Sequence, residues 1–81
     1  MKKRISVIGI IVEDRKTAAS KINQILSDFG DIIVGRMGIP YREKNVSVMA
    51  IICDGTTDEI GALTGKLGQI KNVKVKSAIT N

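Results

Sequence analysis

The stretch "ISVIGIIV", Ile5 to Val12, decides the fold of this chain. It is rich in β-branched residues and apolar at both alternating positions, which is typical of a strand covered on both faces. It is far shorter than the about 20 apolar residues that cross a bilayer. We therefore predict that it is a central strand of a single domain, residues 1–81, and that the chain has no membrane segment.

A helix is expected directly after this strand. Asp14 is a candidate N-cap, and Gly30 is a candidate left-handed terminator. Between them the apolar residues recur at helical spacing on one face: Ala18, Ile22, Ile25, Leu26 and Phe29.

Two further strands are predicted to form a hairpin. The first runs from Asp31 to Ile39, where its glycines indicate a bulge, and Pro40 ends it because proline cannot donate to a sheet ladder. The second runs from Val46 to Cys53. The short connection through Tyr41–Asn45 makes the pair antiparallel.

The remaining residues predict a second helix and a final strand. Thr56 and Glu59 have the spacing of a capping box, and apolar residues then share one helical face up to Ile70. Asn72 is a candidate left-handed residue. The segment Val73–Ile79 alternates as a half-exposed edge strand, with lysines that suit an edge.

The resulting order is βαββαβ, an α+β fold in which two helices cover one face of a four-stranded antiparallel sheet. The other face of the sheet is left uncovered. Because its strands are apolar on both faces, this face is expected to carry a contiguous apolar patch, which indicates a binding surface for a partner. We therefore predict a homo-oligomer, a dimer or tetramer, whose interface is formed by Ile8, Ile10, Val12, Met49 and Ile51.

The net charge of the chain is only a weak indication that it binds polyanions. The 13 Lys and Arg against 8 Asp and Glu give a net charge of +5, which favours encounter with nucleic acid. The basic residues form no dense run, however, and with one Tyr and one Phe there is no stacking platform. A small basic nucleic-acid-binding transcriptional regulator is therefore the alternative function and not the leading one.

Catalytic chemistry is poorly represented. The sequence has no histidine, the commonest general base and metal ligand. Its single cysteine, Cys53, lies in an aliphatic strand, where we expect a small buried hydrophobe that fits a reducing cytoplasm. The aspartates lie at helix and strand ends, where carboxylates favour turns and caps. We expect a non-enzyme without cofactor or metal.

The stretch "GRMGIPYREKNVSVMAIICDGTTDEIGALTGKLGQIKNVKVKSA" resembles the small stand-alone regulators of iron-only hydrogenase systems. More broadly, the chain resembles ACT-type regulatory domains. The resemblance implies a ferredoxin-like fold, oligomerisation, and regulation through a small effector or a protein partner. It also implies a ligand site near the first strand-to-helix loop and the start of the second strand, where this sequence has Asp14, Arg15, Gly30 and Asp31.

The hairpin end adds a second set of candidate ligand residues. Gly38 leaves room for a close approach, while Arg36 and Arg42 supply paired donors for a carboxylate or phosphate. Tyr41 adds a flat face and a hydroxyl. If these side chains converge, the hairpin end recognises an anion; otherwise it is a turn.

Overall fold

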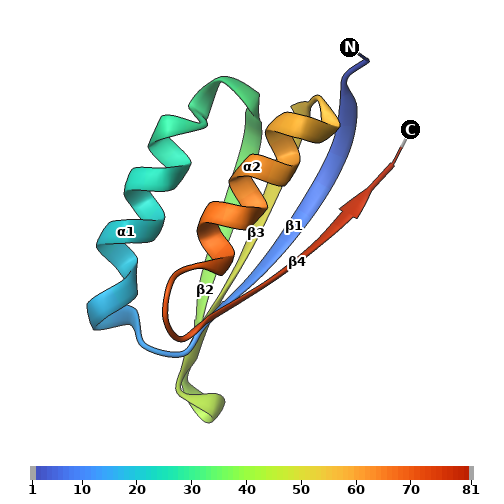
Figure 1. Cartoon of the computed structure of the whole chain (residues 1–81). Helices are drawn as coiled ribbons and strands as arrows, with labels where there is room; N and C mark the ends of the chain where they lie inside the picture. The colour runs from blue at the N-terminus through green and yellow to red at the C-terminus, as the bar shows by residue number, and fades with distance from the viewer. Residues whose placement is uncertain (1, 81) are drawn as a thin grey trace.

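A computed structural model describes residues 2–80 and places both helices on one side of a single sheet (Figure 1). The elements in chain order are β1 (Arg4–Val12), α1 (Arg15–Asp28), the 3-10 turn η1 (Gly30–Ile32), β2 (Ile33–Tyr41), the 3-10 turn η2 (Arg42–Lys44), β3 (Val46–Gly55), α2 (Thr57–Gly68) and β4 (Val73–Ile79). The strand order is β2-β3-β1-β4. The predicted βαββαβ order, the antiparallel sheet and the central position of β1 are confirmed.

The strand register brings distant residues to one end of the sheet. Val12, the last residue of β1, pairs with Ser47 near the start of β3, and Ser47 pairs with Pro40 near the end of β2. The β1–α1 loop and the β2–β3 turn therefore lie at the same end, opposite the chain termini (Figure 1). The prediction that Pro40 ends this strand is wrong, because β2 continues to Tyr41. Pro40 is tolerated inside β2 because this strand is an edge of the sheet.

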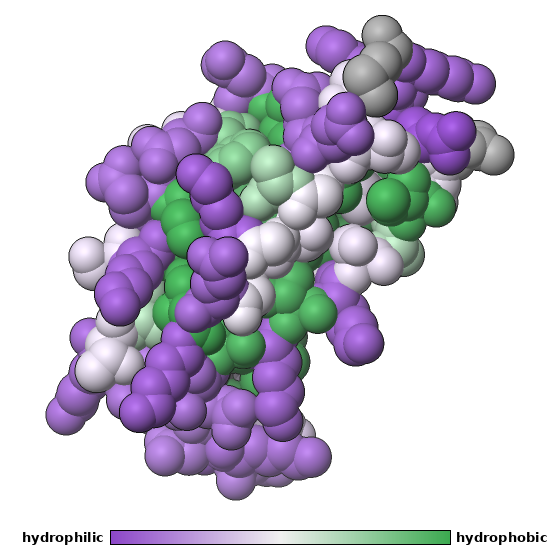
Figure 2. All heavy atoms as spheres, viewed as in Figure 1, coloured by the Kyte–Doolittle hydropathy of each residue, from purple (hydrophilic) through white to green (hydrophobic). Residues whose placement is uncertain are grey.

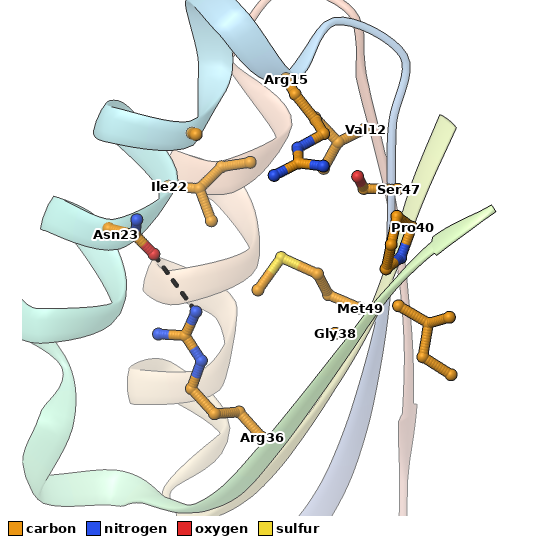
Figure 3. Close-up of a pocket in the computed structure, with 11 residues that line it drawn as sticks. Val12, Arg15, Ile22, Asn23, Arg36, Gly38, Pro40, Ser47 and Met49 are labelled. Atoms are coloured by element: carbon orange, nitrogen blue, oxygen red, sulfur yellow. Dashed lines mark hydrogen bonds between the residues drawn. The ribbon is translucent and has the colours of Figure 1, made fainter. Parts of the chain in front are cut away.

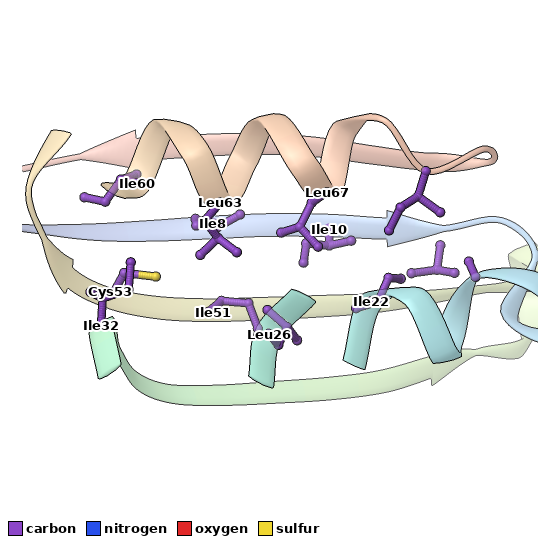
Figure 4. Close-up of a cluster of buried hydrophobic side chains, with 13 residues drawn as sticks. Ile8, Ile10, Ile22, Leu26, Ile32, Ile51, Cys53, Ile60, Leu63 and Leu67 are labelled. Carbon is purple, nitrogen blue, oxygen red and sulfur yellow. The ribbon is translucent and has the colours of Figure 1, made fainter. Parts of the chain in front are cut away.

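The core lies between the helices and one face of the sheet (Figure 4). Ile8, Ile10 and Ile51 point to the helices with no exposed surface and pack with α2 residues such as Leu63 and Leu67. Cys53 is likewise fully buried, as predicted, and this burial raises the pKa of its thiol.

The residues predicted for the oligomer interface therefore lie on the wrong face. Ile8, Ile10, Val12 and Ile51 are core residues, and Met49 packs against the same core. The error has a simple cause. Both alternating sets of β1 are apolar, so the period of two identifies the sets without saying which one the helices cover.

The uncovered face carries the other alternating set. Its large apolar side chains are exposed by 37–62% and come from three neighbouring strands: Ile5, Val7, Met37, Ile39, Tyr41, Val48 and Ile52. We call these residues the open face. Gly9 and Ala50 pair at the centre of the open face. Because both residues are small, no large side chain projects from the centre of this face.

Three further local predictions are confirmed, and one more is wrong. Thr56 and Glu59 form the predicted capping box, β2 has its bulge between Ile33 and Gly35, and Asn72 is left-handed with φ 65°. Gly30, in contrast, has no positive φ and begins η1. The chain here tightens into a 3-10 turn in place of a left-handed stop.

Candidate functional site

A pocket of about 220 Å³ lies between α1 and the neighbouring β2 and β3 strands. Its walls are formed by apolar side chains, Val12, Ile22 and Met49, together with Pro40. Four polar side chains also line it, and Figure 3 shows how they surround the cavity: Arg15, Asn23, Arg36 and Ser47. We call this cavity the arginine pocket.

The fold explains why these residues meet. Arg15 is the first residue of α1, and the loop before it leaves β1 at the same end of the sheet as Ser47 and Pro40. Arg36 lies further along β2, on the sheet face that α1 covers, since it is opposite the core residue Ile51. Packing α1 over β2 thus brings together two arginines that are distant in sequence.

The two arginines enter the pocket from different ends (Figure 3). Arg15 lies beside Val12 and Ser47, and Arg36 reaches towards α1, where its Nη2 donates a hydrogen bond of 3.2 Å to Asn23 Oδ1. Met49 lies between them. The pocket is therefore polar at two ends and apolar in the middle.

Neither arginine is neutralised by the protein. Among residues 2–80 the one ion pair joins Lys74 Nζ to Glu13 Oε1 at 3.7 Å. Both arginines are solvent-exposed, so their guanidinium groups remain accessible. Such planar forks match the geometry of carboxylates and phosphates.

The start of α1 adds positive potential beside Arg15. Asp14 occupies the N-cap position with extended backbone angles, as predicted, but its side chain accepts no capping hydrogen bond, and the first turn has no acidic residue. The first amides of α1 thus lack the side-chain acceptor that α2 receives from Thr56. An uncapped N-terminus of this kind favours a nearby anion.

A second pocket, about 860 Å³, adjoins the first and shares Arg15, Ala19 and Pro40 with it. It lies at the hairpin end, where hydrophilic side chains dominate the surface (Figure 2). It has charges of both signs: Glu13, Asp14, Arg15, Lys16 and Arg42. Tyr41 also lines it and donates from its hydroxyl to Glu43 Oε2 at 3.4 Å.

Most of the predicted ligand residues therefore gather in these two pockets. Arg15, Arg36 and Gly38 line the first, and Asp14, Tyr41 and Arg42 line the second together with Arg15. The expected pairing of Arg36 with Arg42 is not seen, because Arg36 faces α1 while Arg42 lies in η2 beyond the strand. Arg15 is the arginine that shares a pocket with Arg36.

Gly30 and Asp31 are separated from this site. They lie in η1, which follows the C-terminal end of α1, whereas the α1 residues that line the pockets lie between Arg15 and Asn23. Sequence reasoning also missed two polar residues of the arginine pocket. Asn23 lies outside the apolar helical face that the sequence identifies, and Ser47 carries no signal beyond its place in a strand.

Within residues 2–80, no group of three metal-ligating side chains comes together.

The basic residues of the described part of the chain do not form one continuous stripe. Arg4 begins β1 at one end of the sheet, while Lys16 and Arg42 lie at the other end. No helix in the described part of the chain is long and apolar enough to cross a membrane.

The element order and the strand order define a ferredoxin-like α+β protein. The chain belongs to the TM1266-like family, described as "Iron-only hydrogenase system regulator, putative", which matches residues 4–77. The resemblance drawn from the sequence is thereby confirmed, at the level of a regulator family.

Solved structures agree with this assignment. The chain is 40% identical to the uncharacterized protein TM1266 from Thermotoga maritima, with a TM-score of 0.93, and the match covers 99% of this chain and 100% of that one. More distant structures share the fold alone. A protein described as a "putative glycine cleavage system transcriptional repressor" has a TM-score of 0.73 at 14% identity, and the match covers 98% of this chain and 46% of that one.

A second distant structure is CPII from Thiomonas intermedia K12, a nitrogen regulatory PII-like protein. Its TM-score is 0.55 at 14% identity, with 98% of this chain and 95% of that chain covered. No curated protein matches the sequence.

Proposed function

We propose that this protein is a non-catalytic, homo-oligomeric regulator, in an iron-only hydrogenase system, that binds a small effector in the arginine pocket. The observation that carries the proposal is the convergence of Arg15 and Arg36 on one cavity without a carboxylate partner among residues 2–80. Membership of a regulator family supports the regulatory role. The free, buried thiol of Cys53 fits a cytoplasmic location.

The proposed oligomer forms through the open face, and its occupant is a second copy of this chain. The open face is continuous over β2, β3 and β1, and its seven residues are uncharged, with Lys74 and Lys76 beside it on the neighbouring strand β4. A second copy of the chain therefore meets no like charge over these seven residues, and the small Gly9–Ala50 pair allows the two sheets to approach closely. Two-fold pairing of one surface with itself is the commonest form of homo-oligomer.

The effector test is a thermal-shift screen of metabolites at two ionic strengths. A compound that binds only the folded state at 100 times its Kd stabilises it by about 2.7 kcal/mol. We expect small organic anions among the stabilising compounds, with a modest loss at high salt. A duplex DNA whose affinity falls steeply with salt, through several phosphate contacts, would favour the nucleic-acid alternative instead. If no compound of any class stabilises the protein, the effector-binding function is wrong.

Sedimentation tests the assembly independently. We expect a dimer or larger species at tens of micromolar, an order of magnitude at which specific homodimers of moderate affinity persist. A well-folded monomer under these conditions would contradict the proposed oligomer while leaving the pocket untouched.

A further inference from the structure

The arginine pocket also indicates which chemical class of effector it takes, an inference that rests on the proposed function. The relevant features are the size of the pocket, its charge and the arrangement of polar and apolar side chains along its walls. At about 220 Å³, the cavity is smaller than the roughly 300–1,000 Å³ of pockets for drug-sized ligands. The arginine pocket by itself therefore accommodates a ligand of only a few heavy atoms.

An apolar stretch of wall separates the two charged ends of the pocket. Arg15 and Ser47 provide donors at the end near β1, and Arg36 provides donors at the end near Asn23. Between these ends the cavity is lined by Ile22 and Met49, which offer no strong donor. An inorganic phosphate placed at one end would leave the other guanidinium unpaired and the apolar wall wet.

The hydrogen bond of Arg36 leaves capacity for a ligand. Its Nη2 donates to Asn23 Oδ1, which uses a single N–H of a group that carries several in a planar fork. A neutral amide is a weaker partner for a guanidinium than a carboxylate, because charge-assisted hydrogen bonds are the stronger ones. An arriving carboxylate can therefore engage the free N–H groups of Arg36 or replace Asn23 as its acceptor.

We infer that the arginine pocket binds a small aliphatic dicarboxylate. One carboxylate pairs with Arg15 and Ser47, the other pairs with Arg36, and the methylene spacer lies against Ile22 and Met49. Such a ligand balances both unpaired guanidinium charges and covers the apolar middle of the pocket. A monocarboxylate of the same length satisfies one end only.

Calorimetric titration with matched acids tests this inference. The probes are succinate, glutarate and adipate, each compared with the monocarboxylate of equal chain length, and inorganic phosphate. We expect one dicarboxylate to bind at least about tenfold more tightly than its monocarboxylate, since a charge-assisted hydrogen bond lost at one end costs at least that factor. Equal affinity for glutarate and valerate, or preference for phosphate, would overturn the inference.

Substitutions then locate the two carboxylates. Arg36→Gln should weaken the preferred dicarboxylate about tenfold or more and leave its monocarboxylate nearly unaffected at the Arg15 end. Selectivity between the two acids therefore collapses in this variant. Arg36→Lys keeps the positive charge but lacks the planar guanidinium, so this variant should regain part of the selectivity for the dicarboxylate. Arg42→Gln, in η2 outside this pocket, is the matched control and should bind as the wild type does.

The outcomes separate this inference from the proposed function. If a metabolite of another class binds and its affinity depends on Arg15 and Arg36, the effector pocket stands and the dicarboxylate assignment is wrong. If dicarboxylates bind with the same selectivity in Arg36→Gln as in the wild type, the assignment of the second carboxylate to Arg36 is wrong. Circular dichroism of each variant confirms that the fold is retained.

Discussion

The exposed glycines of α2 allow a stability prediction with a magnitude. A Cβ added at Gly61 or Gly65 would meet no atom within 4 Å outside its own helix, and both residues lie inside Thr57–Gly68. Glycine in a helix interior costs about 1 kcal/mol relative to alanine. We therefore expect Gly61→Ala and Gly65→Ala each to raise the free energy of unfolding by about 1 kcal/mol.

The gain should be visible in the melting temperature. For a domain of this size, about 1 kcal/mol corresponds to a rise in Tm of roughly 4–8 °C. The assay is urea and thermal unfolding followed by circular dichroism, at one fixed protein concentration because assembly adds to apparent stability. The double variant should gain about 2 kcal/mol, since neither added methyl group creates a new contact.

Gly55→Ala is the matched control. Its Cβ would lie 3.3 Å from Ile32 Cβ and 3.4 Å from Glu59 Oε1, so we expect a loss of stability from overpacking, about 1–3 kcal/mol. Unchanged or lower stability in Gly61→Ala and Gly65→Ala would refute the reasoning. It would show that this face of α2 is occupied in the folded protein, as close helix packing against another copy would require.

Three further predictions concern assembly, the thiol and the helix cap. Val7→Asp places a charge on the open face and should yield monomers in sedimentation, whereas Ala62→Asp on the exposed surface of α2 should not; assembly unaffected by Val7→Asp would move the interface elsewhere. Native Cys53 should react with a thiol reagent only as fast as the protein unfolds, because it is buried and its pKa is raised; rapid labelling would contradict this. Thr56→Ala should cost about 1 kcal/mol through the lost cap. The hydrogen bonds of the cap lower the pKa of Glu59. The stabilisation from the ionised Glu59 is therefore present above the ordinary glutamate pKa of about 4.3 and is lost as pH falls through the lower folded value. Urea midpoints that fall equally with pH in wild type and Thr56→Ala would argue against this linkage.

The sequence predicts the elements of this fold better than its faces. Helical and strand periods locate β1, α1 and α2 because each period needs only local residues. Which face of β1 is covered depends on register with another strand. Lys74 and Lys76 pair with Ile11 and Gly9, so their charges mark the open face, but that pairing cannot be obtained from one strand alone.

The candidate site shows the same limit. Asp14 and Arg15 could be predicted because the strand-to-helix loop is local, and the resemblance indicates it as a ligand position. The partnership of Arg15 with Arg36 depends on how α1 packs across β2, which no spacing along the chain encodes. Asn23 was missed for the same reason, since a polar residue on a helix is indistinguishable from a solvated one until its neighbour is known.

The most direct test of the account is amide chemical-shift mapping of the ¹⁵N-labelled protein during titration with the most stabilising compound of the metabolite screen. We expect shifts concentrated in α1 between Arg15 and Asn23 and in β2 between Arg36 and Ile39, and their loss when Arg15 and Arg36 are both replaced by glutamine. Shifts confined to the open face, to α2 or to the termini would show that the effector binds elsewhere and would contradict the central claim.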